Sequence, residues 1–173
     1  FIKNDQGNED LDGELFGEVK FTADGTGFTG QAGDYAIEFN GTDEDYAELP
    51  QSEGVVFEEI TLAAWMKGEP TGEWSGIFQS RGGPPIGIGY GGDSGNLTYT
   101  WNDNSADSWN FGATQPQLSL PENEWTFVAL SLTPDDATLF VGPKGGTLEQ
   151  ATNEIPHIAQ TPAVPWRLGE DNC

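Results

Sequence analysis

The sequence has few basic residues and no long apolar run. Its 173 residues include 6 Lys+Arg against 29 Asp+Glu, which gives a formal net charge of -23 at pH 7. So few cations cannot neutralise a run of phosphates, and this excludes nucleic acid as a partner. No stretch approaches the roughly 18 consecutive apolar residues of a membrane-spanning helix, so we expect no membrane insertion.

Cysteine and histidine each occur once. Cys173 is the last residue, so it could form a disulfide only with another molecule. A Ser/His/Asp triad or a zinc site would have to be built on His157, which has no nucleophile motif or second ligand beside it. The chain starts at Phe1 with no basic and apolar leader, which indicates a processed product or an excised piece.

The apolar content is nevertheless sufficient for a folded core. Hydrophobic residues make up 35% of the chain, with 6 Trp, 10 Phe and 4 Tyr, unlike an acidic disordered tail. A length of 173 residues fits one domain. The excess of carboxylates is typical of halophilic proteins or of acidic secreted modules, and calcium could neutralise part of it in either case.

Alternation with a period of two dominates the chain, and no window sustains helical periodicity. The 24 Gly and 11 Pro are spread throughout, and they separate the alternating runs with turn clusters. This pattern predicts strands over residues 36–39, 60–66, 86–90, 97–101, 125–132 and 138–141. We therefore expect a single all-β domain over residues 1–173, built as an antiparallel sandwich or barrel.

Two of the predicted strands are apolar on both faces. Residues 60–67 carry only Thr61 and Lys67 as polar exceptions, and residues 125–132 have the same character. Such strands are typical of the middle of a sandwich, so we expect both to be central and covered on both sides.

Five segments follow the order of motifs in a known family. Residues 39–50 (FNGTDEDYAELP), 60–67 (ITLAAWMK), 124–130 (EWTFVAL) and 166–172 (WRLGEDN) are preceded by an Asp- and Gly-rich loop over residues 5–13. Together they resemble LamG-like domains of the concanavalin A-like lectin/glucanase superfamily. The resemblance implies a concanavalin A-like jelly roll, an antiparallel β-sandwich that spans almost the whole chain.

The chain also departs from that family. The family's first strand and its last strand, which neighbour each other in one sheet, have no counterpart in this sequence. Either the domain is trimmed at both ends or another chain fills the gap, because an open edge leaves backbone groups unpaired. Self-association through an open sheet edge is therefore an expectation. Residues 139–146 lack the family's Asp-Gly turn, which predicts a longer loop there.

Calcium is the metal that the resemblance implies. In LamG-like domains a structural calcium often joins the first loop to a neighbouring turn, and both segments here are rich in oxygen ligands. The candidate ligands are Asp5, Asn8, Asp10, Asp12, Asn40, Asp43 and Asp45. The alternative is that these residues only form Asx turns and solvated faces.

Aromatic and amide side chains gather between Tyr99 and Phe111, and sugars stack their apolar faces on such rings. The candidate carbohydrate-binding residues are Trp74, Tyr99, Trp101, Asp103, Asp107 and Trp109. Alternation also places Tyr99 and Trp101 on one strand face with Leu97, so burial in the core is the competing expectation.

Glycoside hydrolysis is the least favoured activity. Glucanases of this superfamily carry a Glu-x-Asp-x-(x)-Glu pattern on one strand, and the nearest spacing here is Asp10, Asp12 and Glu14. That segment begins with Asp and contains Gly13, so it is typical of a turn. We expect no enzymatic activity.

These observations favour a calcium-stabilised module, extracellular or at the cell surface, that binds a carbohydrate, another ligand or a surface protein, or mediates adhesion. The main alternative is a structural subunit of a surface layer, appendage or filament, because two edge strands are missing and Cys173 is terminal. A glucanase-like hydrolase is the third hypothesis.

Overall fold

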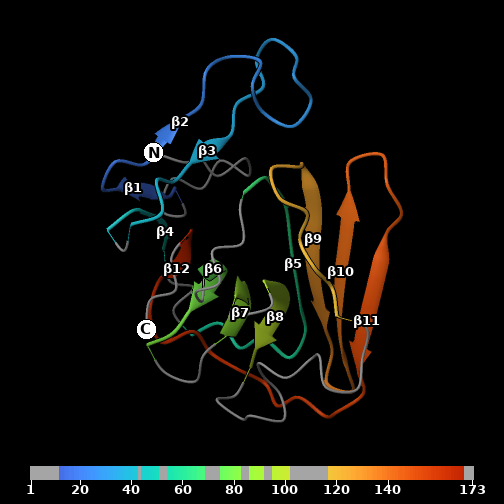
Figure 1. Cartoon of the computed structure of the whole chain (residues 1–173). Coiled ribbons are helices and arrows are strands. Elements are labelled where there is room, and N and C mark those ends of the chain that lie inside the picture. The colour runs from blue at the N-terminus through green and yellow to red at the C-terminus, as the bar shows by residue number, and fades with distance from the viewer. Residues whose placement is uncertain are drawn as a thin grey trace.

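The computed structural model shows two antiparallel sheets that face each other, with a long loop above them (Figure 1). It describes residues 12–42, 44–50, 54–68, 75–82, 86–91, 95–101 and 117–169. No helix in these ranges is long and apolar enough to cross a membrane. The predicted all-β sandwich is confirmed.

Twelve strands make up the described part of the fold. Their bounds are β1 Glu14–Phe16, β2 Lys20–Phe21, β3 Ile37–Glu38, β4 Tyr46–Leu49, β5 Ile60–Met66, β6 Ser75–Ser80, β7 Ile86–Gly91, β8 Asn96–Thr100, β9 Thr126–Leu132, β10 Ala137–Pro143, β11 Glu149–Asn153 and β12 Trp166–Leu168. One sheet has the order β1-β4-β12-β6-β7-β8 and the other β11-β10-β9-β5, while β2 and β3 form a separate pair.

Every strand that alternation predicts is present, as β3, β5, β7, β8, β9 and β10. The strands without a prediction are mostly short, such as β1 with three residues and β2 with two. Glu14 belongs to β1 rather than to the turn that we expected around Asp10 and Asp12. Between β10 and β11 the chain makes the longer loop predicted there.

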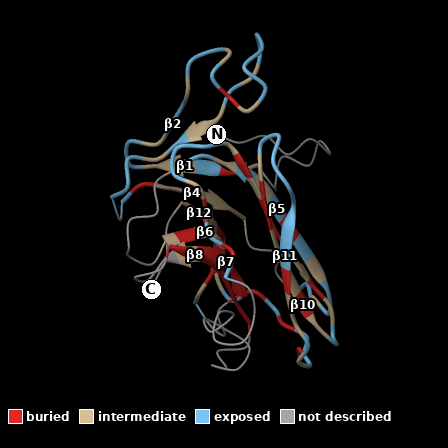
Figure 2. Cartoon of the chain, turned by 45° about the vertical axis from the view of Figure 1, so that its right-hand side comes forward, coloured by how far each residue is buried: buried red, intermediate tan, exposed pale blue. Residues whose placement is uncertain are grey.

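The core lies between the inner faces of the two sheets, where Figure 2 shows the buried segments. Alternate residues of β9, Val128, Leu130 and Leu132, are almost fully buried and meet the buried residues of β7 and β8. Leu139 and Val141 of β10 extend the same apolar layer. Burial of this layer drives the two sheets together.

The prediction that residues 60–67 form a central strand is wrong for the part of the chain that the structure describes. β5 pairs only with β9 there and ends the four-stranded sheet, whereas β9 is central as expected. Leu62 faces the core, but Thr61 and Ala63 are exposed and Trp65 is 40% exposed. Burial of both faces therefore does not explain why the outward residues of β5 are mostly apolar.

Glycines on β7 allow a neighbouring strand to pack closely. A Cβ on Gly89 would lie 2.7 Å from the Nε2 atom of Gln79 and 2.7 Å from the carbonyl oxygen of Ser75. β6 also contains a register shift between Gly76 and Phe78. The side chain of Gln79 thus lies across β7, in space that any larger residue would occupy.

A buried hydrogen-bonded group joins β8 to the segments around β11. The Nδ2 atom of Asn153 donates to the hydroxyl oxygen of Tyr99 at 2.7 Å, and that oxygen lies 3.0 Å from Nε2 of His157. Tyr99 and His157 are both buried. His157, the only histidine of the sequence, is therefore a buried structural residue. Its contact with Tyr99 provides the hydrogen bond that a buried polar group requires.

We expect Tyr99→Phe to lower the free energy of unfolding by about 1–3 kcal/mol, because it removes the hydroxyl that lies between the buried ring of His157 and the partly buried amide of Asn153. Urea denaturation measures the change. Tyr35→Phe is the matched control, since Tyr35 is 53% exposed, and should change stability by less than about 0.5 kcal/mol. Equal effects of the two substitutions would contradict the assigned role of the hydroxyl.

Candidate functional site: an uncharged outer sheet face

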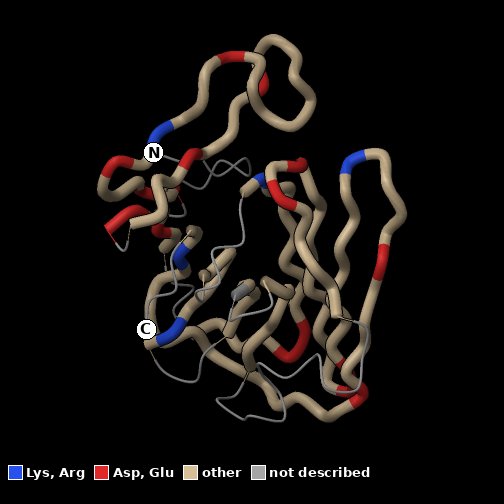
Figure 3. The backbone as a smooth tube through the Cα atoms, in the orientation of Figure 1, with Lys and Arg blue, Asp and Glu red and all other residues tan. Residues whose placement is uncertain are grey.

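Within the strand bounds, the outward side of the four-stranded sheet carries no charged residue, although Glu59 and Lys67 flank β5 on this side by alternation. We call it the outer face; it consists of the residues that alternate with the core-facing ones along β5, β9, β10 and β11, and two of its members, Ala129 and Gly142, are themselves buried. Its members are Thr61, Ala63, Trp65, Phe127, Ala129, Ser131, Thr138, Phe140, Gly142, Gln150 and Thr152. In Figure 3 the tube is tan throughout β9 and β10, while acidic segments lie mainly in turns and in the other sheet.

Strand register arranges the outer face in rows. Trp65 lies opposite Phe127, and in the next row Ala63 and Ala129 lead to Phe140 and Gln150. A third row contains only hydroxyl residues, namely Thr61, Ser131, Thr138 and Thr152. The face thus combines aromatic rings with neutral hydrogen-bonding groups.

Trp65 is the centre of an aromatic cluster. Its ring stacks on Phe28 with centroids 3.9 Å apart and an interplanar angle of 22°, and it lies 5.5 Å from the ring of Phe127. Trp125 meets Phe28 edge-on at 6.2 Å. Contact with Phe28 explains why an exposed strand position holds a large apolar residue.

Phe28 comes from the loop between β2 and β3, which rises above the sandwich in Figure 1. Lys144, in the loop after β10, donates from Nζ to the carbonyl oxygen of Phe28 at 2.6 Å. The same ammonium group lies 4.6 Å from the centroid of the Phe28 ring. These contacts attach the β2–β3 loop to the edge of the outer face.

Asp34 fixes the conformation of that loop. Its Oδ2 atom accepts hydrogen bonds from the hydroxyl of Thr29 at 2.7 Å and from the backbone N–H of Gly30 at 3.1 Å, and also from the N–H of Thr29. The Thr29 hydroxyl is the main reason that the pKa of Asp34 lies below its ordinary value. The backbone N–H groups and Lys144 lower the pKa further, while desolvation opposes them.

The predicted sugar platform is not an exposed surface where the structure describes it. Trp101 is fully buried and donates from Nε1 to the carbonyl oxygen of Ile158 at 2.8 Å. Tyr99 is 2% exposed. Sugar stacking by these two rings is therefore a wrong prediction, because the core covers them. The other predicted residues, Trp74, Asp103, Asp107 and Trp109, lie outside the described residues.

Among the predicted calcium ligands that the structure describes, Asp45 is the most buried, with 1% exposure. Its oxygens accept from the backbone N–H of Glu18 at 2.7 Å and of Asn40 at 3.2 Å. The Nδ2 atom of Asn40 also donates to the Glu18 carboxylate at 3.3 Å. The φ of Gly17 is +68°, and a Cβ there would overlap the Asp45 carboxylate. Glu18, Asn40 and Asp45 thus converge on one turn.

These contacts do not by themselves form a calcium site. Within the described ranges no three His, Cys, Asp or Glu side chains are grouped so as to hold a metal ion. Asp12 lies at the start of the described chain and has a partner of its own. The remaining candidates, Asp5, Asn8, Asp10 and Asp43, lie outside the described residues.

Of the carboxylates considered for hydrolysis, Asp10 lies outside the described residues and Glu14 lies on β1. Glu14 on β1 lies opposite Glu48 on β4, and Glu48 accepts from Nε of Arg167 at 3.2 Å. Arg167 in turn lies 4.0 Å from the ring centroid of Tyr46. The ion pair with Arg167 thus gives the Glu48 carboxylate a structural role in the sheet.

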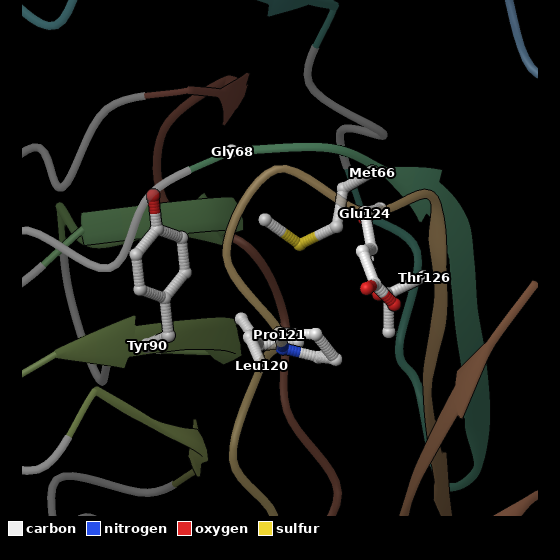
Figure 4. A pocket seen from close by; sticks show the side chains of 7 residues that line it. All are labelled: Met66, Gly68, Tyr90, Leu120, Pro121, Glu124 and Thr126. Atoms are coloured by element: carbon white, nitrogen blue, oxygen red, sulfur yellow. Dashed lines mark hydrogen bonds between the residues drawn. The ribbon is translucent and has the colours of Figure 1, made fainter.

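A small cavity lies between the sheets at one end of β5 and β9 (Figure 4). Its volume of about 10 Å³ is the space of one water molecule. It is lined by Met66, Gly68, Tyr90, Leu120, Pro121, Glu124 and Thr126. A sugar ring does not fit in this cavity.

Sequence reasoning missed three residues of these sites. Trp65 was assigned to a covered strand, although the two polar exceptions of that strand, Thr61 and Lys67, share its face by alternation. That parity was the available signal for an exposed face. Phe28 and Glu18 gave no signal, because their roles depend on contacts with distant segments.

Comparisons with known proteins agree with this architecture. A family model described as the concanavalin A-like lectin/glucanases superfamily matches residues 40–172. The binding domain of Paraclostridial Mosquitocidal Protein 1 has a TM-score of 0.59 at 16% identity, covering 98% of this chain and 42% of that chain. The enzymatically active domain of tailspike protein 2 from bacteriophage CBA120 has a TM-score of 0.51 at 12% identity, covering 79% and 23%.

A further similar structure is Domain 4 of AbnA, a GH43 extracellular arabinanase from Geobacillus stearothermophilus, in complex with arabinotriose. It has a TM-score of 0.46 at 15% identity, covering 90% of this chain and 83% of that one. Comparison with curated proteins gave no match. The chain spans less than half the length of the mosquitocidal-protein and tailspike structures, and these likenesses concern the fold alone.

We expect Asp34→Asn to loosen the β2–β3 loop, because the amide accepts hydrogen bonds from Thr29 and Gly30 more weakly than the carboxylate. The pKa of Asp34 is lower in the folded protein than its ordinary value of 3.8. The contribution of the Asp34 carboxylate to the stability of the folded loop is therefore fully present above pH 3.8, and it is lost as the pH falls through the lowered pKa.

Hydrogen exchange of the Thr29 and Gly30 amides tests this expectation near neutral pH. Exchange should be faster in Asp34→Asn than in the wild type. Asp135→Asn, in the turn at the opposite end of β10, is the matched control. Unchanged protection in Asp34→Asn would show that the carboxylate does not hold the loop.

Proposed function

Because the chain belongs to the concanavalin A-like lectin/glucanase superfamily, we propose that it is a non-catalytic module that binds a neutral polysaccharide on its outer face. The proposed setting is extracellular or at a cell surface, where such polymers occur. An acidic surface keeps a secreted protein soluble and monodisperse, which fits a formal net charge of -23.

One observation carries the proposal, namely a partly exposed sheet face without charge within its strands, in a chain that has 29 acidic residues. If the outer face were only solvated surface, carboxylates would be expected on it as they are elsewhere. Trp65, 40% exposed, lies instead opposite Phe127, and Phe140 lies in the next row, two strands from Trp65. Such an exposed aromatic surface is typical of a binding site.

The chemistry of the face matches a neutral sugar polymer. The apolar side of a sugar ring stacks on aromatic rings, and its hydroxyls exchange hydrogen bonds with groups that both donate and accept. Thr138 and Thr152 provide such groups, with their hydroxyl oxygens 2.9 Å apart. An anionic polymer would be repelled by the net charge of the chain. A neutral polysaccharide therefore fits better than a charged one.

The absence of carboxylates from the outer face also favours binding over hydrolysis. Glycosidases generally place two carboxyl groups about 5–9.5 Å apart on either side of the scissile bond. The outer-face positions hold none, since every one of them is neutral. A sugar chain bound on this face would have no general acid beside it.

We expect Trp65→Ala to weaken binding to a neutral polysaccharide about threefold to tenfold, since one aromatic contact is worth about 0.5–1.5 kcal/mol. A panel of soluble neutral glucans, xylans and arabinans in affinity electrophoresis provides the measurement. Ile158→Ala is the control, because Ile158 is 67% exposed but lies outside the outer face. Retained affinity in a folded Trp65→Ala protein, or binding to no member of the panel, would refute the proposal.

Calcium belongs to the proposal as a stabilising ion. Its support is the resemblance of the sequence, together with the two carboxylates of Glu18 and Asp45 near Asn40, which accept hydrogen bonds from N–H groups in the structure. The rest of its coordination would come from the first loop, with Asp5, Asn8, Asp10 and Asp12 as the candidates, and from Asp43 in the second loop.

We expect calcium to raise the melting temperature, because an ion that binds only the folded state stabilises that state. At a calcium concentration of about 100 times Kd, the gain in the free energy of unfolding is about 2.7 kcal/mol. Differential scanning fluorimetry with calcium, with chelator and with magnesium measures the shift. Asp45→Asn should reduce the calcium-dependent part of it. An identical melting temperature with calcium and with chelator would exclude the ion.

A further inference from the structure

The exposed edge of β5 lacks the devices that usually protect an edge strand. All seven residues of β5 pair with β9 in continuous register, with no bulge, and the strand contains no proline and no charge. Edge strands normally avoid pairing with other chains by such interruptions or by charge. In the described part of the chain nothing pairs with the other side of β5.

The other sheet ends differ from β5. At β8 the edge is partly covered, because Asn96 forms a β-bridge with Ser119 and the N–H of Leu97 donates to the carbonyl oxygen of Leu118. β1 has only three residues and begins with Glu14. β11 begins with Glu149. The protection is therefore weakest at β5, which is also among the longest strands.

We propose that β5 pairs with β5 of a second copy of this chain, antiparallel and around a twofold axis at Ala63. This proposal goes beyond glycan binding and does not depend on it. In this register Ala63 lies opposite Ala63 of the other copy, Thr61 opposite Trp65, and Ile60 opposite Met66. All seven residues are then paired.

Charge complementarity at both ends of the strand favours this register. Continuing the pairing by one residue places Glu59 opposite Lys67 of the second copy, and the twofold axis repeats the contact. Both residues are exposed and lie on the same side of the strand by alternation. Two opposite-charge pairs thus form in a chain that has only 6 basic residues.

The apolar side of β5 supports the same arrangement. Ile60, Ala64 and Met66 pack against the core and are only partly buried. A second β5 would place the same residues beside them and extend the apolar layer across the dimer. Both outer faces would then lie on one continuous sheet, with the hydroxyl of each Thr61 next to the opposite Trp65.

Sedimentation velocity of the full chain in high salt tests the association. Salt screens the repulsion between two chains of formal charge -23. We expect a concentration-dependent dimer of twice the 18.6 kDa chain mass. A monomer at every soluble concentration would overturn the proposal.

Charge reversal tests the register. We expect Glu59→Lys and Lys67→Glu each to weaken dimerisation roughly tenfold, because each replaces two exposed opposite-charge pairs by like-charge pairs. The double variant restores opposite charges and should recover wild-type dimerisation. Unchanged dimerisation in the single variants, or a double variant as weak as either, would overturn the pairing.

Disulfide trapping provides a test that does not depend on charge. Across an antiparallel pair the Cα atoms are about 4.5–5.5 Å apart, within disulfide range. On a Cys173→Ser background, Ala63→Cys should give a covalent dimer on oxidation. Thr61→Cys is the matched control, since the two copies of residue 61 are about 13 Å apart along the strands. Equal cross-linking of the two variants would overturn the register.

Discussion

The packing of two inner sheet faces against each other is the interaction on which this molecule depends. A chain of formal charge -23 repels itself, and only apolar burial between the sheets opposes that repulsion. The buried layer of Val128, Leu130 and Leu139 must therefore be continuous, and the acidic residues must lie in turns and on exposed edges. The outer face departs from this distribution, which is why its neutrality requires a functional explanation.

Sequence patterns predicted those parts of the fold that local alternation determines. β5, β9 and β10 were located because apolar and polar residues alternate along them, or because both faces are apolar. Order within the sheets was less accessible. Residues 60–67 look like a central strand by composition, yet β5 lies at the end of its sheet. The apolar residue on its outward side, Trp65, stacks on Phe28 rather than on another layer of structure. That contact joins segments far apart in sequence.

The candidate sites show the same limit. Tyr99 and Trp101 lie in an aromatic cluster of the sequence, but burial against distant segments decides that they belong to the core. Conversely, Asp45 was recognised as a special carboxylate, while its neighbour Glu18 was not, because the turn at Gly17 brings them together. Composition identifies residues capable of binding, and only tertiary contacts determine which of them are accessible.

The glycines of β7 have a consequence for how such a domain can diversify. Because the side chain of Gln79 lies over Gly89, a mutation that introduces any side chain there meets an occupied space. Position 89 can thus gain a side chain only together with a change at Gln79 on the neighbouring strand. Thr61 and Ala63 on the four-stranded sheet are exposed instead. New side chains are therefore accommodated more readily at these two outer-face positions than at Gly89.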